Sequence, residues 1–106
     1  MPYLYPMANK SLKEDILNTQ NLILVDFYAD WCGPCQTMEP VLQEVIEASA
    51  GKVSLYKINI DKHPQASLQF GVRSIPHYML VRKGKILWRK GGIITKRELL
   101  QVLKGF

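Results

Sequence analysis

Apolar and polar residues follow one another along this chain in blocks whose periods predict strands and helices in turn. Residues 22–29 form an almost continuous apolar run with one charged residue, Asp26, which is typical of a strand that is covered on both faces and central in its sheet. Residues 53–60 alternate between apolar and polar positions and predict a second strand. Between the two strands, apolar residues recur at helical spacing from Met38 to about Ala50. These elements form a β-α-β unit, whose two strands should lie parallel in one sheet.

The second half of the chain predicts a hairpin and then a helix. Residues 78–81 and 86–89 are short apolar runs separated by a tight turn, which indicates two antiparallel strands. Thr95 and Glu98 have the spacing of a helix-capping box. The helix that they begin should bury one apolar stripe, formed by Leu99, Val102, Leu103 and Phe106.

Length and composition agree with one globular domain over residues 1–106. The chain is 47% hydrophobic and 22% charged, which is typical of a globular protein. Two further short helices are expected over residues 11–19 and 65–70. No stretch approaches the roughly 18 apolar residues of a membrane span, and the first residues lack the basic and apolar regions of an export signal. We therefore expect a cytoplasmic protein without membrane contact, and leave open the mature form of an exported one.

Positive charge is concentrated in the second half, where residues 62–106 carry ten basic and one acidic side chain. Five of these basic residues belong to the predicted hairpin: Arg82, Lys83, Lys85, Arg89 and Lys90. Such a cluster can attract acidic proteins or nucleic acid. No motif that reads RNA or DNA accompanies it, so we interpret it as a solvated set that protects the sheet edge and expect no nucleic-acid partner.

The only two cysteines, Cys32 and Cys35, stand where the first strand ends and the first long helix begins. Side chains three residues apart on a helix are neighbours, so the two sulfurs can bond and separate again. At the helix start Cys32 faces unpaired N–H groups and the positive end of the helix dipole, which makes it the predicted nucleophile. Cys35 lies one turn further in, where burial disfavours a thiolate, and is the predicted resolving cysteine. Gly33 lets a partner chain approach closely, and Pro34 stiffens the loop without losing a helix hydrogen bond.

Other roles for the two cysteines remain open from the residues alone. A structural disulfide closes too small a loop to stabilise much chain. A module without catalysis could use the dithiol only to clamp a partner. A metal site formed by Cys32, Cys35, His63 and His77 ranks last, because His63 lies far along the chain in a predicted turn, and we expect no metal.

Asp26 and Lys57 form a second candidate pair. A carboxyl group in the middle of a central strand should have a raised pKa from desolvation, and Asp26 could then carry the proton that Cys35 loses or gains. Lys57, opposite on the neighbouring strand, is the expected partner that makes such burial tolerable. The residues alone favour a pair with a purely structural role.

The order of the elements and the C-x-x-C motif at the end of a strand resemble the thioredoxin family. The matching residues lie between about residues 10 and 106: Val25-Asp26-Phe27, Trp31 to Cys35, Met38, Pro40, Lys57, Asn59-Ile60-Asp61, Phe70 to Pro76, Gly84 and Gly92. The resemblance implies an α/β protein with the thioredoxin fold, whose central mixed sheet combines a parallel β-α-β unit with a C-terminal antiparallel hairpin and is flanked by helices. It also shifts the interpretation of Asp26 and Lys57 towards catalysis.

The resemblance further implies a monomeric protein-disulfide reductase. Cys32 would attack a disulfide of a target protein, Cys35 would resolve the mixed disulfide, and a flavin-containing thioredoxin reductase would restore the dithiol, with no cofactor on the chain itself. Pro76 would be a cis-proline, and the Ile75 backbone would pair with the target like an added strand. The implied docking surface consists of Trp31, Gly33, Pro34, Ile75, Pro76 and Gly92. A disulfide oxidase or isomerase of the same fold is the alternative, against which the Gly-Pro pair between the cysteines argues.

Three residues depart from the family pattern. His77 follows the expected cis-proline, where the family usually has threonine, Tyr78 replaces an aliphatic residue, and Tyr28 replaces a common tryptophan. A His77 side chain that faced the cysteines could tune the thiolate or contact the substrate. The alternation of side chains along a strand instead favours a His77 side chain that points away from the cysteines. It would then have a role in packing or at the surface.

Overall fold

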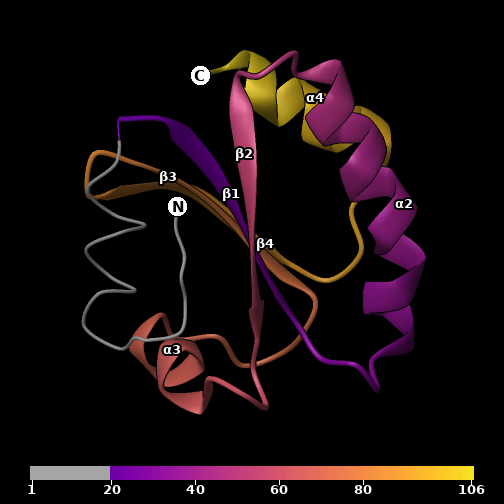
Figure 1. Ribbon diagram of the computed structural model, residues 1–106, viewed down its shortest axis with the longest axis vertical. Helices are drawn as coiled ribbons and strands as arrows, with labels where there is room; N and C mark the ends of the chain where they lie inside the picture. Colours follow the sequence, from indigo (N-terminus) through magenta and orange to yellow (C-terminus); the bar gives the residue numbers. More distant parts are fainter. Residues whose placement is uncertain (1–19) are drawn as a thin grey trace.

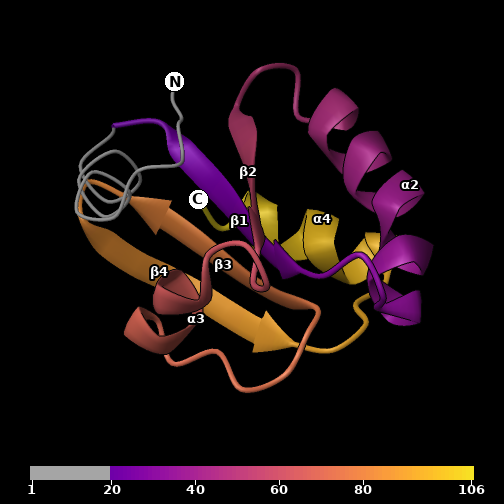
Figure 2. The ribbon, with the colours of Figure 1, turned by 60° about the horizontal axis from the view of Figure 1, so that its bottom comes forward.

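The computed structural model describes residues 20–106 as a four-stranded sheet between two layers of helices. Two helices cover one face of the sheet, and a shorter helix lies against the other face (Figure 1, Figure 2). The helix expected over residues 11–19 lies outside the described residues. In the described part, no helix is both long enough and apolar enough to cross a membrane.

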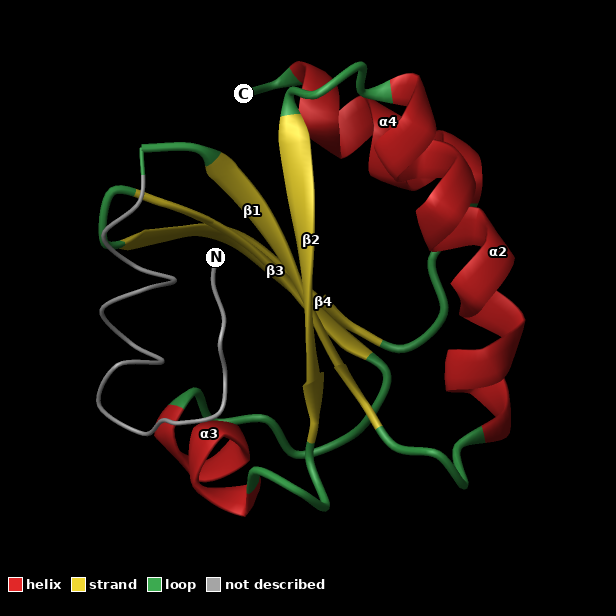
Figure 3. Cartoon of the chain, viewed as in Figure 1, coloured by secondary structure: helices red, strands yellow, loops and turns green. Residues whose placement is uncertain are grey.

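The elements follow one another as a β-α-β unit, a short helix, a hairpin and a last helix (Figure 3). They are β1 (Leu22–Tyr28), α2 (Gly33–Ala48), β2 (Val53–Asn59), α3 (Pro64–Gln69), β3 (His77–Arg82), β4 (Lys85–Gly91) and α4 (Lys96–Lys104). Across the sheet the strand order is β2-β1-β3-β4, with β1 and β2 parallel and the other neighbouring pairs antiparallel. The structure confirms the predicted mixed sheet flanked by helices.

Strand β1 is an inner strand that is buried on both faces, as its apolar run predicts. Leu22 and Leu24 belong to the core beneath α2 and α4, whereas Val25 and Phe27 belong to the core beneath α3. A slip of the strand by one residue would exchange these two sets of side chains, so the burial fixes the register of β1. It thereby also fixes the point where β1 ends and the cysteine loop begins.

Helix α2 is held against the sheet by one apolar stripe. Met38, Leu42 and Val45 are buried in the core that it shares with β1 and α4, and their spacing of four and three residues places them on one face. The helix ends at Ala48, two residues before the predicted end, and Gly51 with a φ of +87° turns the chain towards β2. This packing positions the first turn of α2 at the carboxyl end of β1.

The structure confirms the predicted start of α4 and corrects its predicted end. The Thr95 hydroxyl caps the helix, because it accepts the backbone N–H of Glu98 at 3.0 Å. The Glu98 carboxylate accepts from the Lys90 ammonium on β4 at 2.7 Å instead of completing the capping box. The prediction of a buried Phe106 is wrong: α4 ends at Lys104, and Phe106 beyond it is 38% exposed.

The cap of α4 can be tested by replacing Thr95. Thr95→Ala removes the oxygen that accepts the Glu98 N–H and should lower the free energy of unfolding by about 1 kcal/mol, measured by urea denaturation. Thr37→Ala is the matched control, because the Thr37 hydroxyl donates to the Gly33 carbonyl within α2 at 3.2 Å and caps no helix. Alanine is also the better helix former at that position, so a loss in Thr37→Ala as large as in Thr95→Ala would contradict the capping role.

Candidate active site

The two cysteines form a disulfide at the amino end of α2, where the chain leaves β1. Cys32 and Cys35 are only 4% and 6% exposed, and they share a small buried cluster with Ala29. The backbone N–H of Cys32 donates to the Ala29 carbonyl at 3.2 Å, which closes the loop tightly. The bond itself lies at the surface end of this cluster, since the neighbouring Gly33 and Pro34 are exposed.

Cys32 occupies the N-cap position of α2. Its sulfur accepts the backbone N–H of Cys35 at 3.2 Å, so it takes up a donor that the first turn of the helix leaves unpaired. Pro34 lies in the same turn, where its missing N–H leaves no further donor unsatisfied. Once the disulfide is reduced, this hydrogen bond and the helix dipole both favour a thiolate on Cys32.

The loop before β3 brings Ile75 and Pro76 to the cysteines. The Ile75–Pro76 peptide bond is cis, as the family resemblance implies. Ile75 is half-buried and packs against the cluster that contains both cysteines. The backbone N–H of Gly92 donates to the Pro76 carbonyl at 2.8 Å, so the start of the β4–α4 loop joins the same surface.

Trp31 directly precedes Cys32 and is 68% exposed. Its indole N–H donates to an Asp61 carboxylate oxygen at 2.8 Å. Asp61 is itself held by Asn59, whose side-chain oxygen accepts the Asp61 N–H at 2.9 Å. The sequence assignment did not include Asp61 in the site, although its position directly after the end of β2 is a signal that could have suggested it.

Asp26 lies in the middle of β1 and is 2% exposed. Burial raises the pKa of its carboxyl group to about 6, and the positive charge of Lys57, its partner in register on β2, partly opposes this shift. One carboxylate oxygen, Oδ1, is buried without a hydrogen-bond partner among the described residues. Such a group is a base whose strength suits proton transfer near neutral pH.

The ammonium group of Lys57 binds a different carboxylate. It forms an ion pair with Glu39 of α2 and lies 4.5 Å from the centre of the Tyr28 ring. Lys57 therefore lies opposite Asp26, as expected, but gives its hydrogen bond to Glu39. Sequence reasoning missed Glu39, although its position one helical turn after Cys35 places both side chains on the same side of α2.

A recess of about 410 Å³ opens beside Cys35 and contains this ion pair. Its lining residues are Tyr28, Ala29, Asp30, Cys35, Gln36, Glu39 and Lys57. Water in the recess can reach the Cys35 side of the disulfide as well as the Lys57 ammonium.

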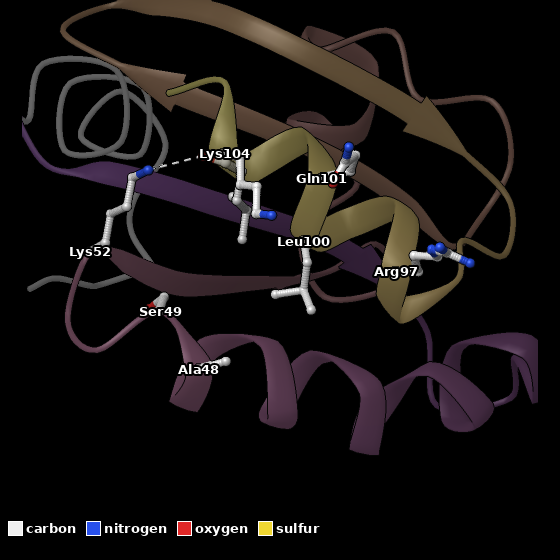
Figure 4. Close-up of a pocket in the computed structure, with 8 residues that line it drawn as sticks. Ala48, Ser49, Lys52, Arg97, Leu100, Gln101 and Lys104 are labelled. Carbon is white, nitrogen blue, oxygen red and sulfur yellow. Dashed lines mark hydrogen bonds between the residues drawn. The ribbon is translucent and has the colours of Figure 1, made fainter.

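Another groove, of about 530 Å³, lies between the last turn of α2 and helix α4 (Figure 4). Three basic residues, Lys52, Arg97 and Lys104, line it, and Lys52 donates to the Leu103 carbonyl at 3.0 Å. Helix α2 has 16 residues and is thus about 24 Å long, so this groove lies far from the cysteines at its other end.

His77 and Tyr78 point to opposite faces of β3. His77 packs edge-on against Phe27, and its Nε2 accepts from Arg89 at 3.1 Å. Burial and the nearby Arg89 charge lower the pKa of His77. Tyr78 lies on the other face beside Asp26, and its hydroxyl is buried without a hydrogen-bond partner in the described part of the chain.

The candidate metal ligands do not form a cluster. Within residues 20–106, no group of three His, Cys, Asp or Glu side chains is arranged to hold a metal ion. Nε2 of His77 is taken up by Arg89, and both sulfurs are joined in the disulfide.

Comparison with known proteins identifies the family. The family profile described as Thioredoxin matches residues 4–105. A thioredoxin from Synechocystis sp. is 37% identical over 100 residues, which cover 94% of each chain. Thioredoxin 1 from Nostoc sp. is 36% identical over 92% of each chain, and a thioredoxin from Rhodospirillum rubrum is 39% identical over 90% of this chain and 91% of its own. The chain therefore belongs to the thioredoxin family, and with its Cys32–Cys35 disulfide it is a thiol–disulfide oxidoreductase.

Proposed function

We propose that the chain is a protein-disulfide reductase. The observation that carries this proposal is the position of Cys32 as the N-cap of α2, with its sulfur accepting the Cys35 N–H at 3.2 Å. In the reduced protein the Cys32 thiolate attacks one sulfur of a target disulfide, and the other target sulfur leaves as a thiolate. Cys35 then attacks the Cys32 sulfur of the mixed disulfide and releases the target. Two electrons pass to the target, and the Cys32–Cys35 disulfide forms.

Asp26 and Lys57 serve the second step of this reaction. The Cys35 thiol has to lose a proton before it attacks, and the buried Asp26 carboxylate is the base that accepts it. A pKa of about 6 makes Asp26 a stronger base than an ordinary carboxylate. Lys57 acts through its charge, which limits how far that pKa rises.

Target proteins dock around the disulfide on a surface whose residues are exposed or half-buried apart from the buried Pro76. This docking surface consists of Trp31, Gly33, Pro34, Ile75, Pro76 and Gly92. The target backbone pairs with Ile75 as an added strand, which needs no particular target sequence. The space around the Gly33 Cα is open, so a target backbone can come close to it. A side chain at this position would occupy that space and hinder the approach of the target.

Electrons come from a thioredoxin reductase, and the chain acts without a bound cofactor as a single-domain monomer in the cytoplasm. Membership of the thioredoxin family supports the reductase partner. The basic hairpin does not bind nucleic acid in this proposal, since two of its cations already have partners: Lys90 binds Glu98 at 2.7 Å, and Arg89 donates to His77 at 3.1 Å and to the Phe70 carbonyl at 2.5 Å.

The roles of the cysteines can be tested by single substitutions. Cys32→Ser should abolish dithiol-dependent reduction of insulin, because it removes the attacking sulfur. Cys35→Ser should still attack but accumulate mixed disulfides with target proteins, detectable by non-reducing gel electrophoresis. Retained turnover in Cys32→Ser would overturn the assignment. No mixed disulfides from Cys35→Ser, together with slow turnover of the unmodified protein, would instead favour a redox-sensitive binding module.

The direction of electron flow can be tested by equilibrating the protein with graded glutathione buffers at about pH 7. A reductase should be largely disulfide even where glutathione is mostly reduced, because its pair is the more reducing and passes its electrons to oxidised glutathione. A pair that is equally or more oxidising than glutathione would support the disulfide oxidase or isomerase instead. The fraction of dithiol is measured by alkylation and mass spectrometry.

The burial of Asp26 predicts a pH-dependent stability. Because the folded pKa is raised to about 6, the folded state binds the proton more tightly than the unfolded state, and an ionised Asp26 costs about 3 kcal/mol above that pH. This cost is absent below about pH 4, where both states are protonated. Asp26→Asn should therefore be more stable than the unmodified oxidised protein at about pH 7.5, and nearly equal to it at about pH 3.5, in urea denaturation. A difference that does not change with pH would contradict the raised pKa.

A further inference from the structure

Glu39 is an acidic side chain beside Cys35 that has no role in the proposed function. It lines the recess beside Cys35 and forms an ion pair with Lys57 there. The two side chains are 40% and 30% exposed, so the pair is reached by water but not fully solvated. Lys57, which carries this ammonium group, is the residue of β2 that lies directly opposite Asp26 in the sheet register.

Lys57 therefore interacts with two carboxylates: it forms an ion pair with Glu39, and its charge partly opposes the rise in the pKa of Asp26. The Glu39 carboxylate holds its ammonium in the recess, where the Tyr28 ring adds a cation–π contact at 4.5 Å. The buried Asp26 retains an oxygen without a hydrogen-bond partner among the described residues. A carboxylate that accepts an ammonium hydrogen bond becomes a much weaker base, commonly by one to three pH units. Which carboxylate binds Lys57 thus decides how strong a base Asp26 is.

The groups that face Asp26 from each neighbouring element leave Glu39 as the competitor for Lys57. On β2 the facing group is Lys57, and on β3 it is Tyr78, whose hydroxyl carries no charge near neutral pH because burial raises its pKa. Helix α2 contributes Cys35 and Glu39 to the recess, and the loop before α2 contributes Asp30, whose carboxylate accepts from the Asn59 amide at 3.5 Å. Helix α4 presents the apolar Leu99 and Leu103 to this side of the sheet.

We propose that Glu39 is a positioning residue for the dithiol reaction: it holds the Lys57 ammonium in the recess beside Cys35 and so prevents Lys57 from pairing with the Asp26 carboxylate. The consequence is that Asp26 stays a strong enough base to take the proton of Cys35. This consequence rests on the proposed role of Asp26, whereas the competition for Lys57 does not. The ion pair adds little to stability, because water screens ion pairs that are partly exposed.

The test is the titration of the Asp26 carboxyl carbon, followed by NMR in the oxidised protein. In Glu39→Gln the freed ammonium can move to Asp26, and the titration midpoint of Asp26 should fall by about one pH unit. Glu44→Gln is the matched control: it removes the same charge from α2 and breaks the ion pair of Glu44 with Lys96, which lies outside the recess. It should leave the Asp26 midpoint within about 0.2 pH units of the unmodified protein.

A second background separates an effect through Lys57 from a direct effect of the Glu39 charge. In Lys57→Met no ammonium can be released, so adding Glu39→Gln should move the Asp26 midpoint by well under half of the shift seen with Lys57 present. An unchanged midpoint in Glu39→Gln, or equal shifts with and without Lys57, would overturn the proposal. Equal shifts in Glu39→Gln and Glu44→Gln would overturn it as well.

The role of Asp26 in the reaction has its own readout. If Asp26 accepts the proton of Cys35, the pH at which release of the mixed disulfide slows should fall in Glu39→Gln by the same amount as the titration midpoint. If the midpoint falls and the release profile does not, the competition for Lys57 stands and the proposed role of Asp26 fails. The two ideas can therefore fail separately.

Discussion

The two-sided burial of β1 is the constraint on which the rest of this structure depends. One set of its side chains lies beneath α2 and α4 and the other beneath α3, so the strand can neither shift nor twist out of the sheet without exposing apolar surface. The loop that follows inherits this fixed position, and α2 packs back on the same core from there. The fixed position of β1 therefore fixes the position of both sulfurs at the start of α2.

The same burial creates the electrostatic problem of the site. A carboxylate in such a strand loses its hydration, and at neutral pH an ionised Asp26 costs about 3 kcal/mol, a large part of the 5–15 kcal/mol that typically stabilises a small domain. A directly bonded Lys57 would remove much of that cost, yet its ammonium binds Glu39. The cost of ionising Asp26 thus remains, because the ammonium group is bonded to the other carboxylate.

Local patterns predicted the features that depend on neighbours in sequence. The apolar run of β1, the cysteines at the helix start and the Thr95 cap of α4 all depend on residues within one or two turns of each other, so periodicity and capping rules suffice to find them. The error at Phe106 has a similarly local cause. The apolar stripe continues in the sequence, but the helix ends at Lys104, and beyond it the spacing no longer maps to one face.

The contacts that decide the chemistry were harder to predict, because they join elements far apart in the chain. Asp26 and Lys57 could be placed opposite one another from the parallel register of two predicted strands. The partner of Lys57 could not, because it depends on how α2 crosses β2 and which of its side chains reaches the recess. An ion pair forms more readily with a carboxylate that is cheaper to ionise, and the half-exposed Glu39 is cheaper to ionise than the buried Asp26. The difference in hydration between the two acids, and not their distance along the sequence, therefore accounts for which of them pairs with Lys57.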